Sequence, residues 1–158
     1  PGRVADTIIE NRDLIVGVKV RQGGAQVGDN GVEPLKLAIE AAERADVPIM
    51  CHIGAGVRLP EILKLMRPGD VITHCFQGVG DSILDEKGRV IPDAWAARQD
   101  GVIFDVGHGA GSFRYEVAQQ AMQQGFISDV ISTDLHIGNI NGPVYDLPTT
   151  LSKFLHLS

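Results

Sequence analysis

Short apolar runs alternate with helix-like segments along the whole sequence. The strand-like runs cover residues 14–20, 47–53, 70–75, 102–106 and 129–133. The helix-like segments cover residues 33–45, 59–66, 92–99 and 113–124, and another starts near 147. Strands that alternate with helices and are buried on both faces form parallel βαβ units. The sequence therefore predicts an α/β protein with about five parallel strands.

The number of strand-like runs is too small for a closed barrel. A complete (β/α)8 barrel takes about 250 residues, whereas this chain has 158. The chain begins at Pro1 rather than at a methionine, and its final segment ends inside a helical pattern. No repeat and no shift in composition marks a second domain. We therefore expect one domain over residues 1–158 that forms the later part of a (β/α)8 TIM barrel.

Composition excludes several classes of protein. The net charge of −6 and the pI of about 5.2 leave no basic stripe to bind nucleic acid or an anionic membrane. No apolar run approaches the roughly 18 residues that a membrane span needs, and no signal peptide is visible. The two cysteines are too few for a disulfide framework. We expect a soluble, cytoplasmic protein.

Four polar side chains lie where four of the apolar runs end. They are Lys19, His52, His74 and Asp134. In β/α scaffolds the carboxyl ends of the parallel strands open onto one face, so residues distant in sequence converge there. A lysine, two histidines and a carboxylate at one face are suited to binding metal ions.

Lys19 lies between two valines in a run that otherwise excludes charge, and a buried ammonium is costly. Three interpretations are open. The lysine can belong to an edge strand and extend to solvent. It can form a Schiff base, as in an aldolase-type lyase. Alternatively, its neutral amine can take up carbon dioxide and form a carbamate that bridges two cations.

His52 and His74 occupy equivalent positions on neighbouring strand-like runs, and neutral imidazole is a common zinc ligand. A single histidine at a strand end is more often a structural, hydrogen-bonded residue. The adjacent Cys51 and Cys75 suggest a rival Cys2His2 site. Successive residues of a strand point to opposite faces, so a cysteine and its neighbouring histidine cannot easily bind one ion. We interpret the cysteines as small buried apolar residues.

Asp134 and His108 are the candidate catalytic residues. Asp134 can cap a turn, but beside a metal-activated water a carboxylate can bind the ion and transfer a proton. His108 lies in a glycine-rich turn that matches neither GxGxxG nor a P-loop. It can contact the substrate or an oxyanion, or it can simply be part of the turn. His136, two residues after Asp134, is a weaker candidate and is expected to belong to the loop.

The ordered set of Lys19, His52, His74 and Asp134 resembles the amidohydrolase superfamily of metal-dependent hydrolases. That superfamily has a His-x-His pair on its first strand, a carboxylated lysine on the fourth, histidines on the fifth and sixth and an aspartate on the eighth. The resemblance implies that this chain is the C-terminal portion of the barrel, strands 4–8. Three segments are similar to the deacetylase subgroup labelled dihydroorotase-like or adenine-deaminase-like, namely residues 16–21, 106–113 and 142–154.

The resemblance implies an amidohydrolase that cleaves amide or ester bonds of small molecules by metal-activated hydroxide. The cofactor would be one or two Zn²⁺ or other divalent ions. Lys19 would be the bridging carbamate, and His52 and His74 would bind the second ion. Asp134 would bind the first ion and act as base and proton shuttle.

The sequence departs from the superfamily in one respect, because residues 1–18 contain no histidine and hence no His-x-His pair. An alternative is therefore a catalytically inactive barrel fragment with a vestigial metal site. A part-barrel also leaves apolar strand edges unpaired. We expect a homo-oligomer that covers these edges.

Overall fold

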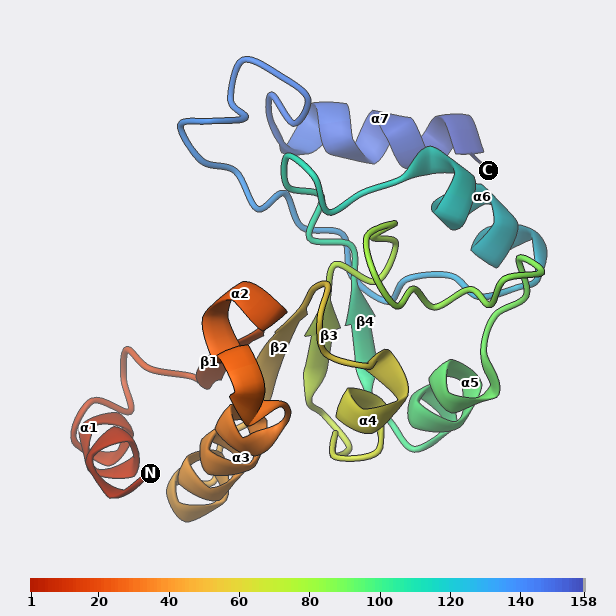
Figure 1. Cartoon of the computed structure of the whole chain (residues 1–158). Helices are drawn as coiled ribbons and strands as arrows, with labels where there is room; N and C mark the ends of the chain where they lie inside the picture. Colours follow the sequence, from red (N-terminus) through yellow and green to blue (C-terminus); the bar gives the residue numbers. More distant parts are fainter. Residues whose placement is uncertain (158) are drawn as a thin grey trace.

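The computed structural model describes residues 1–157, in which four parallel strands form one sheet in the order β1-β2-β3-β4 (Figure 1). The strands are β1 (Val18–Gln22), β2 (Ile49–Ile53), β3 (Val71–Thr73) and β4 (Ile103–Asp105). Each strand pairs in parallel with the next one along the chain. Sequential parallel pairing with intervening helices is the arrangement of a partial (β/α)8 barrel.

The helices lie between and around the strands, with α3, α4 and α5 along the sheet and α6 and α7 at the top of the view in Figure 1. Their bounds are α1 (Gly2–Glu10), α2 (Gly24–Val27), η1 (Gly28–Asn30), α3 (Glu33–Ala45), α4 (Leu59–Leu63), α5 (Pro92–Gln99), α6 (Tyr115–Gln123) and α7 (Leu147–Leu157). None of the helices in the described chain is long and apolar enough to cross a bilayer.

The expected helices at 33–45 and 92–99 have the observed bounds, whereas the strands are shorter than expected. Residues 14–17 do not join β1, because β2 begins only at Ile49 and offers them no partner. The run at 129–133 is not a full strand: it forms a single parallel bridge between Asp105 and Val130. Backbone hydrogen bonds still hold it beside the chain after β4, including 3.0 Å from the His108 nitrogen to the Ser132 oxygen. The periodicity of the sequence does not predict helix α1.

The register of the sheet separates an apolar row from a polar row. One row joins Val20, Cys51, Ile72 and Phe104, of which the last three are fully buried. The next row joins Arg21, His52, Thr73 and Asp105. Because side chains alternate between the two faces of a strand, these rows point to opposite sides of the sheet.

Cys51 therefore faces the core while its neighbour His52 faces the other side. Both cysteines are fully buried and free. Burial raises the pKa of the Cys51 thiol to about 12, and it raises the pKa of Cys75 as well. The thiols are neutral and apolar in this position, which fits their interpretation as core residues.

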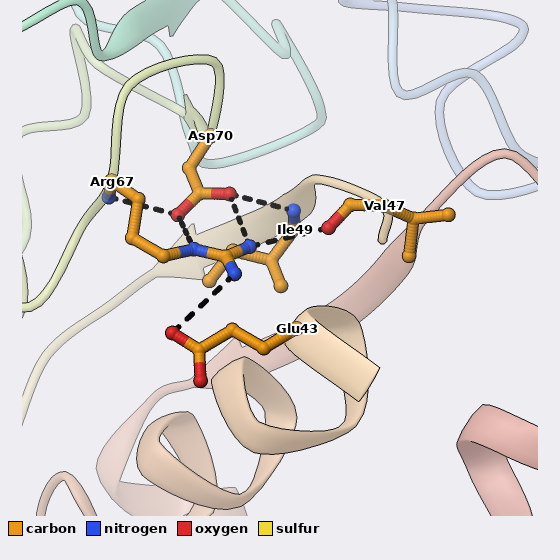
Figure 2. Close-up of polar contacts among 5 residues, drawn as sticks. All are labelled: Glu43, Val47, Ile49, Arg67 and Asp70. Carbon is orange, nitrogen blue, oxygen red and sulfur yellow. Dashed lines mark hydrogen bonds and ion pairs between the residues drawn. The ribbon is translucent and has the colours of Figure 1, made fainter. Parts of the chain in front are cut away.

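The buried carboxylate of Asp70 is bonded to the Arg67 guanidinium and to the beginning of β2 (Figure 2). It accepts hydrogen bonds from the backbone nitrogens of Ile49 (2.9 Å) and Arg67 (2.8 Å), and two more from the Arg67 guanidinium (2.9 and 3.0 Å). Its backbone oxygen accepts the Ile103 nitrogen at 2.9 Å. Asp70 directly precedes β3, so this residue joins the first residues of β2 and β4 to β3. Arg67 also reaches the Val47 oxygen, at 3.2 Å, and the Glu43 carboxylate of α3, at 3.8 Å.

We predict that Asp70→Ala lowers the free energy of unfolding by about 3–5 kcal/mol, because it leaves a guanidinium and buried N–H groups without their acceptor. Glu40→Ala is the matched control. It removes an exposed pair with Arg44 and should cost no more than about 0.5 kcal/mol. Urea unfolding followed by circular dichroism measures both. Equal losses in the two variants would contradict the role assigned to Asp70.

Candidate functional site

The imidazoles of His52 and His74 face each other across the ends of β2 and β3. Nδ1 of His52 lies 2.7 Å from Nε2 of His74, and the rings are nearly perpendicular at 83°. Nδ1 of His74 lies 2.6 Å from the Gly107 oxygen. Because a carbonyl only accepts, His74 carries its proton on Nδ1 and presents an unprotonated Nε2. His52 therefore donates from Nδ1, and the two ring nitrogens are directed at the space between them.

Both imidazoles are held in the neutral form. Burial, reinforced by the neighbouring His74, lowers the pKa of His52 to about 4. Burial also lowers the pKa of His74, although the Gly107 carbonyl and Asp134 act in the opposite direction. Neutral imidazole is the form that binds metal ions, so the pair needs no deprotonation at neutral pH.

A cavity of about 330 Å³ opens beside His52. Its lining residues are Lys19, Arg21, His52, Ala110, Gly111, Ser112, Asp134 and His136. Three of the four predicted metal-site residues thus share one cavity, and His74 is joined to it through His52. The charges of Lys19 and Asp134 both act on the two imidazoles, which is consistent with their proximity.

The imidazole pair supplies part of the donor set that a metal ion needs. No group of three or more His, Cys, Asp or Glu side chains within residues 1–157 is arranged to hold a metal ion. Nε2 of His74 is unprotonated, and Nδ1 of His52 becomes so when His52 carries its proton on Nε2 instead, with no change of charge; such nitrogens are the ligands that zinc prefers. The residues therefore fit as part of a metal site, and its remaining ligands would have to come from other groups at the cavity, where Lys19 and Asp134 lie.

The backbone is strained at two of the predicted residues. His74 has φ of 70° and Asp134 has φ of 46°, in the left-handed region that residues with a side chain rarely adopt. Such strain persists only where surrounding contacts enforce it, and it is common at functional sites. Gly107 and Gly109 lie beside these residues, also with positive φ. A Cβ on Gly109 would lie 2.9 Å from Oδ2 of Asp134, so the glycine allows the loop to approach the carboxylate.

We predict that Gly107→Ala destabilises the fold and displaces His74. An added Cβ would overlap Oγ1 of Thr73 and lie 2.7 Å from Nδ1 of His74, at a residue with φ of 46°. We expect a loss of at least about 2 kcal/mol in unfolding free energy. Gly111→Ala is the control, since an added methyl group there would meet nothing within 4 Å and the φ of Gly111 is not positive. A Gly107→Ala protein as stable as the control would be evidence against close packing here.

The carboxylate of Asp105 lies on the polar row, beside Thr73. Its Oδ2 accepts hydrogen bonds from Thr73 Oγ1 (2.7 Å) and Ser132 Oγ (2.8 Å). Its buried Oδ1 has no hydrogen-bond partner within residues 1–157. Asp105 also acts on His74 through space, in the direction that raises its pKa. The row thus holds a carboxylate whose charge acts on His74.

His108 is buried and has a different set of neighbours from the other predicted residues. Its Nε2 lies 2.7 Å from Nζ of Lys153 on α7, and its Nδ1 lies 2.9 Å from the Gly109 oxygen. Its ring stacks on Phe113 with centroids 4.6 Å apart. The cavity wall is formed by the three residues that follow Gly109 rather than by His108 itself. Its role as a substrate or oxyanion contact stays a prediction.

We predict that Lys153→Met raises the pKa of His108. Burial and the Lys153 ammonium both lower that pKa in the folded protein, burial being the larger effect. The unfolded chain therefore takes up a proton first as the pH falls below about 6.5. Stability should decline below that pH, and decline less steeply in the variant. A histidine NMR titration measures the pKa, with the exposed Lys87→Met as control. An unchanged His108 titration would contradict the contact.

Sequence reasoning missed Arg21 and Ser112 and gave His136 little weight. Arg21 could have been found from its spacing, since it lies two residues after Lys19 and hence on the same face of β1. His136 and Ser112 lie on loops, and no periodicity indicates where a loop side chain points. Asn139 was also missed: it is fully buried, and its side chain holds the Asp134 oxygen (2.9 Å) and the His136 nitrogen (2.8 Å).

Comparison with known proteins shows close relatives over nearly the whole chain. A deacetylase from Enterococcus faecalis is 48% identical over 154 residues, which is 95% of this chain and 42% of that protein. The deacetylase Atu3266 from Agrobacterium fabrum is 41% identical over 97% of this chain and 38% of its own length. The chain thus spans about two-fifths of these relatives. No protein-family profile matches it.

Solved structures agree with these relatives. An adenine deaminase superposes with a TM-score of 0.93 at 44% identity, covering 98% of this chain and 43% of that one. A dihydroorotase superposes with a TM-score of 0.92 at 41% identity, covering 99% of this chain and 41% of its own. These findings confirm the resemblance to the amidohydrolase superfamily, and they confirm that the chain corresponds to part of its barrel.

Proposed function

We propose that this chain carries the metal-binding and proton-transfer groups of an amidohydrolase that cleaves amide or ester bonds of small molecules, in the manner of a deacetylase. The observation that carries the proposal is the pair of neutral imidazoles, His52 and His74, with nitrogens 2.7 Å apart beside the cavity of Lys19 and Asp134. The relatives named deacetylase, adenine deaminase and dihydroorotase support the same class of chemistry.

Lys19 supplies the missing third ligand in this proposal. Its amine lies at the cavity, where it would react with carbon dioxide to give a carbamate and release a proton. The carbamate oxygens, the two imidazoles and the Asp134 carboxylate would hold one or two divalent ions, zinc being the best match to the nitrogen ligands. When bound, the cation supplies Lewis acidity, which polarises the acyl carbonyl and acidifies water.

Asp134 performs the proton transfers. Its carboxylate lines the cavity and is held in a strained backbone conformation by Asn139. A new C–O bond forms as water attacks the acyl carbon, and Asp134 accepts the water proton. It then delivers this proton to the departing nitrogen or oxygen as the old bond breaks, so the carboxylate is regenerated. His52 and His74 stay neutral throughout and take no part in the proton transfer.

We predict that the purified protein binds about one equivalent of zinc per chain and that Lys19→Ala abolishes this binding. Removing the carbamate removes a ligand, so a small carboxylic acid in the same space should restore part of the metal content. Lys87→Ala, at an exposed lysine outside the cavity, should bind normally. Metal analysis by mass spectrometry after gel filtration measures all three. Wild-type protein without stoichiometric zinc, nickel or manganese would contradict the proposal.

Activity separates an enzyme from a vestigial site. Asp134→Asn should retain the ion held by the imidazoles and the carbamate, and lose about 10²–10⁴-fold in kcat on N-acetyl amino acids or acetyl esters, with zinc and bicarbonate present. A metal-bound wild-type chain without turnover would indicate an inactive barrel fragment. Borohydride trapping of a carbonyl compound on Lys19 would instead indicate Schiff-base chemistry and exclude the carbamate.

We also infer that a second copy of the chain covers the outer edge of β1. Within the described chain, β1 pairs only with β2, and Leu14 and Val16 before it are 77% and 80% exposed. An unpaired strand edge flanked by apolar side chains favours association. Light scattering at micromolar concentration should show a dimer or larger species, weakened by Val16→Lys. A monodisperse monomer would contradict the inference.

A further inference from the structure

The ring of His136 is fixed in one tautomer at the cavity wall. The backbone N–H of Gly138 donates a hydrogen bond to Nδ1 of His136 at 3.0 Å. Nδ1 is therefore an acceptor, and the neutral ring carries its proton on Nε2. The same side chain lines the cavity with Lys19, His52 and Asp134. Within residues 1–157 no acceptor is hydrogen-bonded to Nε2, so this N–H is available to a ligand.

The glycine at position 138 is required for this arrangement. A Cβ there would lie 2.9 Å from Cε1 and 3.1 Å from Nδ1 of His136. A larger residue would push the imidazole away from its present position. The turn therefore both bonds the ring and leaves space for it.

The backbone that carries the ring is anchored by the fully buried Asn139. Its Oδ1 accepts the His136 N–H at 2.8 Å, and its Nδ2 donates to the Asp134 oxygen at 2.9 Å. One side chain thus fixes Asp134 and His136 relative to each other. An exposed loop histidine with a fixed ring and a fixed backbone loses little conformational entropy on binding, which is the condition for an effective hydrogen bond to a ligand.

We propose that His136 is a substrate-binding residue of the hydrolase proposed above, on which this inference rests. It donates a hydrogen bond from Nε2–H to an acceptor oxygen of the acyl substrate, a carbonyl or carboxylate oxygen. His136 takes no part in proton transfer, which belongs to Asp134. The bond orients the substrate toward the His52 side of the cavity.

Two substitutions of His136 test whether a hydrogen-bond donor is needed at the position of Nε2. The amide nitrogen of glutamine in His136→Gln lies near the place of Nε2, whereas that of asparagine in His136→Asn lies near the place of Nδ1. With N-acetylglycine as substrate, we expect His136→Asn to raise KM on the order of tenfold, the cost of one lost hydrogen bond. His136→Gln should stay within about threefold of wild type. His156→Asn, on the exposed side of α7, is the matched control and should change neither KM nor kcat.

A binding experiment tests the inference without turnover. The ¹⁵N spectrum of the five histidines should show His136 as the Nε2–H tautomer, and N-acetylglycine should shift its Nε2 signal while leaving His156 unchanged. A shift of the His136 signal without hydrolysis would support the contact and count against the proposed function alone. Hydrolysis with a wild-type KM in His136→Asn, or an unshifted His136 signal at saturating N-acetylglycine, would overturn the inference.

Discussion

The buried carboxylate of Asp70 sets the geometry on which the rest of the molecule depends. The Asp70 carboxylate accepts a hydrogen bond from the first residue of β2, and the Asp70 backbone oxygen accepts one from the first residue of β4. Parallel strands have no tight hairpin to fix their register, so contacts at their starting ends must do so. A shift of one residue would turn His52 into the core and bring Cys51 to the polar side. The Arg67–Asp70 pair therefore lies at the opposite end of the sheet from the His52–His74 pair, whose position depends on the register that Asp70 fixes.

The histidine pair follows directly from that register. His52 lies beside Thr73 on the neighbouring strand, and His74 is the next residue along the chain, with a left-handed backbone. This conformation and the glycine at 107 let the His74 ring turn toward His52 while its other nitrogen donates to the Gly107 carbonyl. The two imidazoles thus meet, one from β2 and one from the residue after β3. Asp134 reaches the same cavity by a second strained backbone position, held by Asn139.

The sequence predicts the elements that carry a periodic signal. The helices at 33–45 and 92–99 are predictable with their observed bounds, because apolar spacing and an early proline define them. The polar residues at strand ends are also predictable, since the common direction of parallel strands brings those ends together. The run at 129–133 has the apolar residues of a strand, yet it forms only one bridge, because pairing depends on neighbours that the local sequence does not describe.

The loop contributions could not be predicted in the same way. His136, Ser112 and Asn139 lie on loops, and no spacing rule encodes their positions. His108 shows the converse: a histidine in a conspicuous glycine-rich turn contacts Lys153 and Phe113 instead of lining the cavity. The residue types indicated which functional groups the chain contains, whereas the backbone conformation determined which of these side chains line the same cavity.

The alternation of rows across the sheet has a consequence for how such a protein can diversify. The apolar row and the Asp70 contacts maintain the scaffold, while the cavity wall is supplied largely by short loops after β4 and after residue 133. Replacements in those loops can reshape the pocket without touching the strands that present the imidazoles. A lineage built on this plan can therefore vary the shape of the pocket while the imidazole pair stays in place.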